Sequence, residues 1–174
     1  MNDRFINEVT CGDSEQLIQE LDDNSIDLLI TSPPYNVDLG YNAKHKNPYD
    51  IYQDNKDHSD YIDWLQRIFG NVKAKMVTGG RVCINIGDGR NGSVPTHSDI
   101  IQFMTRELGY IMMATIIWNK NTTGNRTAWG SYMSPSCPSF PSSFEFILIF
   151  AKDQKKKPGD KDKITVSKDE FIHN

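Results

Sequence analysis

The chain has 174 residues, of which 37% are hydrophobic and 24% are charged, and its formal net charge is −4. This length predicts one domain with a sizeable core. No apolar run is long enough to span a bilayer, and the first residues lack the layout of a secretory signal. We therefore expect a cytoplasmic protein rather than a membrane protein. The negative charge is unfavourable for a protein that binds nucleic acid by itself.

The three cysteines are far apart and do not have the spacing of metal ligands, so we predict no metal site. Cys11 and Cys83 lie in apolar runs, which is typical of reduced thiols in the core of a cytosolic protein.

The first 31 residues predict a compact βαβ unit. A strand is expected over residues 6–11, followed by a helix from about 15 to 21, with Asp13 or Ser14 as its N-cap. A second strand is expected over residues 26–30, because this short apolar run includes β-branched residues.

The stretch Thr31-Ser32-Pro33-Pro34-Tyr35 ends that second strand. Neither proline can donate a backbone hydrogen bond, so the ladder stops and a stiff turn follows at the carboxyl end of the strand. Open α/β sheets bind ligands at this end. The turn offers a hydroxyl, carbonyl acceptors and an aromatic ring, which suit a planar base with an exocyclic amino group. The alternative is a plain proline loop whose tyrosine packs back on the core.

The rest of the chain alternates between helices and strands. A loop over residues 36–56 precedes a helix over 59–76 with a clear apolar stripe, which Gly79-Gly80 should end. Strands are expected over 81–86, 110–118 and 144–151. A glycine-rich loop over 87–92, a helix over 98–108 with Gly109 after it, and a second long loop over 119–142 separate them.

This alternation predicts a doubly wound, mainly parallel, Rossmann-like α/β sheet, in which the strand before Ser32 is internal and an antiparallel edge is possible. Residues 1–152 would form the domain. Residues 153–174 would form a charged linker and tail.

The turn resembles the catalytic motif of DNA methyltransferases that modify exocyclic amino groups, Asp/Asn/Ser-Pro-Pro-Tyr/Phe. Further pieces match that family in order, and the resemblance covers nearly the whole chain to about Lys152: Cys11-Gly12-Asp13-Ser14, Gly79-Gly80, Trp118-Asn119-Lys120, Thr127-Ala128-Trp129-Gly130-Ser131 and Glu145-Phe146-Ile147-Leu148. The resemblance implies S-adenosylmethionine as the cofactor and double-stranded DNA as the substrate, with the target base flipped out of the helix.

By this resemblance, the catalytic residues are Ser32, Pro33, Pro34 and Tyr35. The Ser32 hydroxyl and the Pro33 carbonyl would accept both N–H groups of the target amino group, and Tyr35 would stack on the base. Asp13, which is equally well interpreted as a helix cap, and Thr31 would contact the cofactor. The candidate DNA contacts are Asn36, Lys44, Lys46, Lys120 and Trp129. Serine at the first motif position favours N4 of cytosine; the alternative is N6 of adenine.

The order of the motifs resembles the circularly arranged, beta-class enzymes, in which the catalytic half comes first. Glutamine and some RNA methyltransferases have a similar turn, but their glycine-rich cofactor loop precedes it, and here only Gly12 occurs before Ser32. The cofactor loop Phe-x-Gly-x-Gly and a target-recognition region do not appear after the turn either. We therefore expect an amino-terminal half that needs a second polypeptide or a missing carboxyl-terminal half, or else an inactive, partner-dependent fragment.

Overall fold

The structure is a computed structural model, and it describes residues 3–36, 55–121, 142–157 and 159. Short helical turns at Asp3–Phe5, α1 (Ser14–Leu17) and Ile18–Glu20 precede β1 (Ile26–Thr31). Helix α2 (His58–Lys75), strand β2 (Met76–Ile86) and the single turn α3 (Gly89–Gly92) follow. Helix α4 (Thr96–Gln102) continues as a π-helical turn, Phe103–Glu107, before β3 (Ile111–Asn119) and β4 (Phe144–Ala151).

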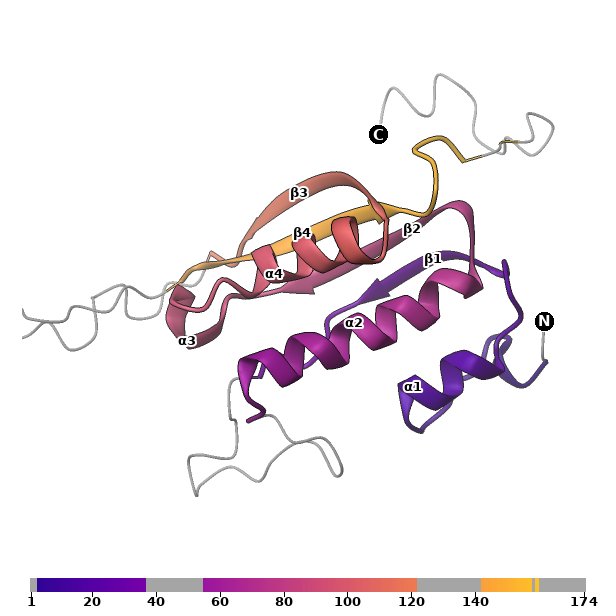
Figure 1. Ribbon diagram of the computed structural model, residues 1–174, viewed down its shortest axis with the longest axis horizontal. Coiled ribbons are helices and arrows are strands. Elements are labelled where there is room, and N and C mark those ends of the chain that lie inside the picture. Colours follow the sequence, from indigo (N-terminus) through magenta and orange to yellow (C-terminus); the bar gives the residue numbers. More distant parts are fainter. Residues whose placement is uncertain (1–2, 37–54, 122–141, 158, 160–174) are drawn as a thin grey trace, which may run out of the picture.

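The four described strands form one sheet in the order β1-β2-β4-β3 (Figure 1). Strand β1 is parallel to β2, while β4 is antiparallel to both of its neighbours. Strands β1, β2 and β3 therefore run in one direction and β4 alone runs in the other, as a mainly parallel sheet requires. Among the described strands β1 lies at the edge of the sheet, whereas the sequence predicted an internal position for it.

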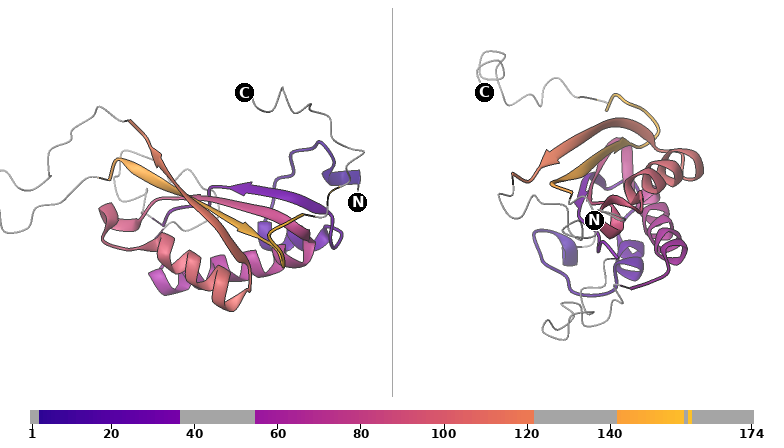
Figure 2. Two further views of the ribbon diagram at one scale, coloured as in Figure 1. Left: turned by 90° about the horizontal axis from the view of Figure 1, so that it is seen from above. Right: turned by 90° about the vertical axis from the view of Figure 1, so that its left-hand side faces the viewer.

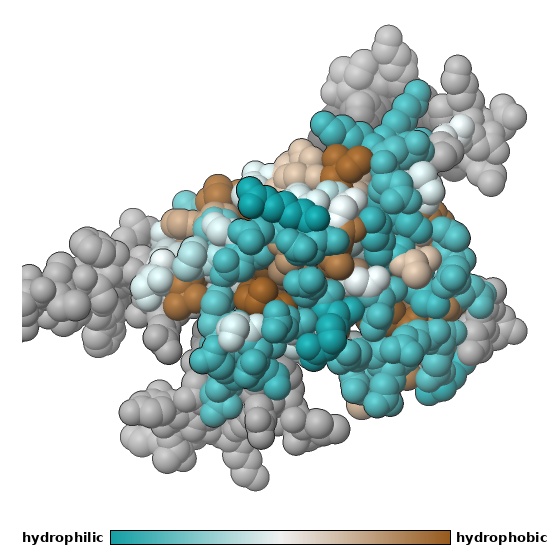
Figure 3. All heavy atoms as spheres, in the orientation of Figure 1, coloured by the Kyte–Doolittle hydropathy of each residue, from teal (hydrophilic) through white to brown (hydrophobic). Residues whose placement is uncertain are grey.

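Helices α2 and α4 cover the same face of the sheet (Figure 2). Between them and the sheet lies the core, to which β2 contributes Val82, Ile84 and Ile86, and β4 contributes Leu148 and Phe150. The stripe of α2 that faces them is apolar at helical spacing, as predicted: Tyr61, Leu65, Phe69 and Val72. The outer surface over these helices is mainly hydrophilic (Figure 3).

The opposite face of the sheet is apolar but is not covered by a helix of the described residues. The register places Ile30, Cys83 and Ile149 in one cross-strand row on this face, and Ile30 is 71% exposed. Leu28 of β1 and Ile116 of β3 extend the same apolar surface, and both are exposed. Exposed apolar surface of this kind is typical of a face that another element covers. We call this surface the open face.

Two predictions about local structure are wrong. Residues 6–11 form no strand: Val9 is 101% exposed, and Cys11 is an exposed thiol rather than a core residue. The pair Gly79-Gly80 does not end the helix, because α2 already ends at Lys75 and both glycines lie inside β2. There they belong to an irregularity in the pairing of the two strands. Ile26 pairs with Met76, but Leu28, two residues later in β1, pairs with Arg81, five residues later in β2, so the extra residues of β2 bulge out.

The described residues contain no helix that is long and apolar enough to cross a membrane. Within the same ranges, no group of three or more His, Cys, Asp and Glu side chains could hold a metal ion.

Candidate active site

The turn after β1 is anchored by the helix layer. Pro33 is buried, and the Pro34 carbonyl accepts a hydrogen bond of 2.6 Å from the hydroxyl of Tyr61 in α2. Tyr61 is itself fully buried, so this donor is held rigidly. Ser32, by contrast, is exposed. The turn is therefore fixed on the side that faces α2, and the Ser32 side chain is exposed to solvent.

The Tyr35 hydroxyl is the centre of a polar network that joins β1, β2 and β4. It donates to Glu145 Oε2 at 2.9 Å and accepts from Ser32 Oγ at 3.1 Å. It also accepts from Asn85 Nδ2 at 2.8 Å, and the same nitrogen donates to Glu145 Oε2 at 2.8 Å. The phenolic oxygen thus makes one bond as donor and two as acceptor, which is its full capacity.

Lys120, which follows β3, forms an ion pair with the other oxygen of Glu145. Burial would raise the pKa of Glu145, but hydrogen bonds from Lys120, Asn85 and Tyr35 and the charge of Lys120 outweigh it and hold that pKa below its usual range. Burial, with the Glu145 hydrogen bond and charge adding to it, raises the pKa of Tyr35 to about 12. At neutral pH the pair is therefore an ionised carboxylate and a neutral phenol.

The network lies on the open face of the sheet, at the end where β1 and β2 terminate. Asn85 has the same side-chain direction as Cys83, and Glu145 the same as Ile147. The Tyr35 ring packs beside the backbone of Gly87, where a Cβ atom would lie 3.3 Å from Tyr35 Cε2. A side chain at position 87 would therefore displace the ring.

A cleft of about 960 Å³ opens beside this network. Tyr35, Lys120 and Glu145 line one part of it. The rest of the described lining comes from the end of the turn after β1, the start of α2, the segment after β2 and the start of β4: Asn36, Asn55, Lys56, Asp57, His58, Gly87, Asp88, Gly89, Val94, Thr96, Ser142 and Phe144. The cleft lies at the carboxyl ends of β1 and β2, where ligands bind in open α/β sheets.

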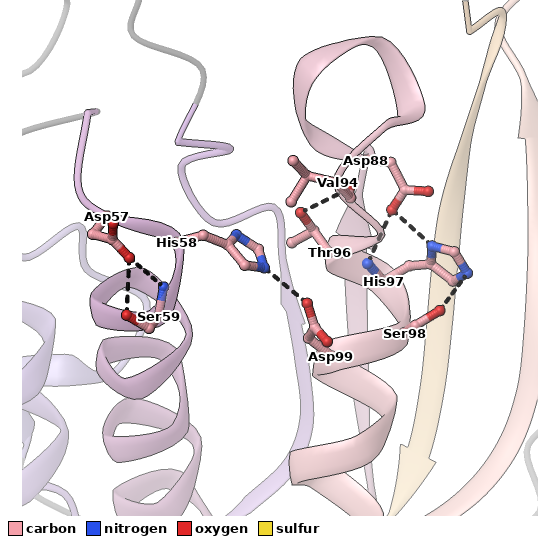
Figure 4. A network of polar contacts seen from close by, with 9 residues as sticks. All are labelled: Asp57, His58, Ser59, Asp88, Val94, Thr96, His97, Ser98 and Asp99. Atoms are coloured by element: carbon pink, nitrogen blue, oxygen red, sulfur yellow. Dashed lines mark hydrogen bonds and ion pairs between the residues drawn. The ribbon is translucent and has the colours of Figure 1, made fainter.

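Two histidine–aspartate pairs hold the wall of the cleft together (Figure 4). His58 Nε2 lies 2.8 Å from Asp99 Oδ2, which ties the start of α2 to α4. His97 Nδ1 lies 2.7 Å from Asp88 Oδ1, which also accepts the His97 backbone N–H at 3.1 Å. Ser98 Oγ lies 3.1 Å from His97 Nε2, but neither Ser98 nor His97 is among the described residues that line the cleft. We interpret Asp88 as a cap for the first turn of α4, and we do not interpret Ser98 as a nucleophile that His97 activates.

The remaining predicted site residues are placed as follows. Asp13 accepts the Glu15 backbone N–H at 2.9 Å and is therefore the N-cap of α1, and Thr31 pairs with Ile84 in the sheet. Asn36 has a positive φ of 56°. Its side chain makes two 2.8 Å hydrogen bonds with the backbone of Lys56, which brings the two sides of the intervening segment together. Lys44, Lys46 and Trp129 lie outside the described residues.

Sequence reasoning assigned no role in the site to Asn85 or Glu145. Glu145 has a recognisable signal, because it is the one polar residue of β4, and Asn85 lies between two isoleucines near the end of β2. Because β4 runs opposite to β2, its first residues lie beside the last residues of β2, and only the register brings Glu145 to Asn85 and Tyr35.

The fold and the site together define an open α/β sheet with a rigid Ser-Pro-Pro-Tyr turn at the carboxyl end of a strand. A family model described as DNA methylase, for N6 and N4 modification, matches residues 26–171. The type II methyltransferase M.MjaVI of Methanocaldococcus jannaschii is 34% identical over 96% of this chain and 82% of its own length. The chain belongs to this family of DNA methylases.

Solved structures agree on the fold. The protein TTHA0409 of Thermus thermophilus, in complex with S-adenosyl-L-methionine, is 26% identical, with a TM-score of 0.57 over 87% of this chain. The cytosine-N4-specific PvuII DNA methyltransferase, known from Proteus hauseri, matches with a TM-score of 0.60 at 18% identity over 88% of this chain. The chain spans 57% and 51% of these two proteins, respectively.

Proposed function

We propose that this chain carries the catalytic half of a DNA methyltransferase that modifies the exocyclic amino group of a flipped base, with N4 of cytosine as the target. The observation that carries the proposal is the Ser32–Tyr35 turn, which Tyr61 fixes through the Pro34 carbonyl, with Ser32 exposed and Tyr35 lining the cleft. Membership of the DNA methylase family supports the reaction class. Serine at position 32 favours cytosine, and the alternative target is N6 of adenine.

The chemistry follows from the poor nucleophilicity of an amino group conjugated to a ring. The Ser32 hydroxyl and the Pro33 carbonyl accept its two N–H groups, which favours a tetrahedral nitrogen with a localised lone pair. That nitrogen forms the new N–C bond in line as the C–S bond breaks and its electron pair stays on sulfur; the extra proton then leaves to water in the cleft. Catalysis is positioning and electrostatics, without a covalent intermediate.

S-adenosylmethionine, as in the TTHA0409 complex, supplies an electrophilic methyl group when bound. Asp13 and Thr31 would hold part of it. The sequence contains no Phe-x-Gly-x-Gly turn, which the family resemblance implies for the cofactor; the glycine-rich loop over residues 87–92 follows β2 and does not have this pattern. We propose that a carboxyl-terminal half, in the same chain or in a second polypeptide, supplies that turn and the target recognition. Asn36 and Lys120 line the cleft and are proposed DNA contacts, with Lys44, Lys46 and Trp129.

The decisive experiment identifies the product. Duplex DNA is methylated with tritiated cofactor by the assembly that contains this chain, and it is then hydrolysed to nucleosides. We expect N4-methyl-2′-deoxycytidine. Finding N6-methyl-2′-deoxyadenosine would move the target to adenine and leave the role of the turn intact, whereas 5-methyl-2′-deoxycytidine would contradict the mechanism. No methylation by any assembly would favour an inactive fragment.

A further inference from the structure

The polar network leaves no freedom in the direction of its hydrogen bonds. A carboxylate can only accept, so Tyr35 must donate its single proton to Glu145. The two remaining sites on the phenolic oxygen are acceptors, and Asn85 Nδ2 fills one of them. The Ser32 hydroxyl at 3.1 Å must therefore donate to the other. The charge on Glu145 therefore determines the orientation of the Ser32 hydroxyl through Tyr35, although Glu145 and Ser32 are not hydrogen-bonded to each other.

This orientation has a consequence at the exposed side of Ser32. Because the Ser32 proton points to Tyr35, the oxygen lone pairs remain for a ligand. A target amino group has two N–H donors, so it needs an acceptor at this position. If Glu145 were neutral, Tyr35 would no longer be required to donate to it, and the Ser32 proton could turn toward the ligand instead.

We infer that Glu145 is a positioning residue for methyl transfer, which acts through Tyr35 to hold Ser32 as a hydrogen-bond acceptor for the target amino group. This inference rests on the proposed function. Lys120 keeps Glu145 charged from the side of β3. Lys120 and Tyr35 are the titratable groups that contact Glu145 within the described ranges. The orientation of the Asn85 amide follows from Glu145, because the carboxylate can only accept and therefore requires the Asn85 nitrogen on its side. The buried Oδ1 of Asn85 has no hydrogen-bond partner among the described residues.

The first test uses the 174-residue chain itself. Tyrosines labelled with ¹³C at Cζ are followed by NMR through alkaline titration, and Tyr35→Phe identifies the Tyr35 signal. Tyr35 should ionise near the value of about 12 set by its surroundings, and Glu145→Gln should shift it toward an ordinary tyrosine. Glu107→Gln, at an exposed glutamate in the π-helical turn, should cause no shift. An unchanged Tyr35 titration in Glu145→Gln would overturn the inference regardless of activity.

The second test measures single-turnover methylation by the DNA-methylating assembly that contains this chain. Glu145→Gln should lower the rate ~10-fold while DNA affinity stays within about twofold. The same substitution should have no further effect in a Tyr35→Phe background, since Glu145 acts only through that hydroxyl. The wild-type rate should fall as Glu145 is protonated at acid pH, and the variant should lack this fall.

The outcomes separate the inference from the proposed function. Equal rates for the wild type and Glu145→Gln, or losses that add in the double variant, would overturn the positioning role and leave the proposed function standing. A wild type that methylates no DNA in any assembly would overturn the proposed function, and the positioning role with it.

Discussion

At the scale of single residues, Tyr35 has two separate tasks. Its hydroxyl makes three hydrogen bonds inside the protein, and the residue also lines the cleft. Tyr35 is in addition partly buried against the hydrophobic core, so packing on the core and lining the cleft are both observed for this residue. The ring remains the proposed platform for a flipped base.

We expect Tyr35→Ala to weaken binding of duplex DNA by ~1–3 kcal/mol, the usual cost of losing an aromatic ring under a nucleobase. Tyr35→Phe keeps the ring and should keep the affinity. Fluorescence anisotropy with the complete assembly measures both. A duplex with an abasic target position is the control, because the wild type and Tyr35→Ala should bind it equally. Equal binding of the intact duplex by these two proteins would contradict the stacking role.

Glu145 should make stability depend on pH. Its pKa is lowered in the fold from 4.5, so its contribution to the free energy of unfolding is fully present above that value and is lost as the pH falls through the lowered pKa. Glu145→Gln should therefore be less stable than the wild type at pH 7, and the difference should shrink in acid. Urea unfolding from pH 7 to pH 3.5 tests this, with Glu107→Gln as the control. A difference that stays constant with pH would contradict it.

At the scale of elements, β2 contains a bend that depends on one glycine. Gly79 has a φ of +75°, and a Cβ atom there would lie 2.7 Å from the Cα of Lys157. Its backbone N–H donates to the Lys152 carbonyl at 2.8 Å, and the Lys152 ammonium binds the Met76 carbonyl at 2.7 Å. The segment after β4 is thus fastened onto the irregular part of β2.

Gly79→Ala should destabilise the protein by ~1–3 kcal/mol, because alanine is strained at positive φ and its methyl group meets the backbone of Lys157. Gly70→Ala is the matched control: Gly70 lies inside α2, where its Cβ would make an ordinary contact of 3.5 Å with Leu108. That change should be stabilising by ~0.5–1 kcal/mol. Thermal or urea unfolding of both variants gives the result, and two effects of the same sign would contradict this explanation.

The sequence was sufficient for elements with strong periodicity or long apolar runs. Helix α2 and strands β3 and β4 agree with their predictions to within one or two residues. The strand that the sequence predicted over residues 6–11 is absent, because no other described strand pairs with this segment. The turn at Ser32 was recognisable because proline chemistry is local. The partners of Tyr35 were not, because Asn85 and Glu145 lie 50 and 110 residues away and meet it through strand register.

At the scale of the whole molecule, the described domain has an apolar open face and an edge strand, β1, that carries the turn. An unpaired edge and an uncovered apolar face both favour association with another chain. A carboxyl-terminal half would pair with the edge strand and cover the apolar face. It would also supply the basic surface for DNA that this chain, with a net charge of −4, does not provide.

We therefore expect the 174-residue chain alone to bind S-adenosylmethionine weakly, to leave DNA unmethylated, and to self-associate or bind a partner. Isothermal titration calorimetry and sedimentation give these results. A monomer with sub-micromolar cofactor affinity, about −8 kcal/mol or better, would contradict the proposal that half of the cofactor site comes from elsewhere.

The reversed direction of β4 separates its carboxyl end from the catalytic turn. Strand β4 ends beside Gly80 and Arg81, and Lys157 then forms an ion pair with Asp27 near the start of β1. Ser32 follows the other end of β1. The contacts of residues 152–157 therefore stabilise the sheet at the end opposite to the turn, so changes in this segment should alter stability without moving the Ser32 hydroxyl.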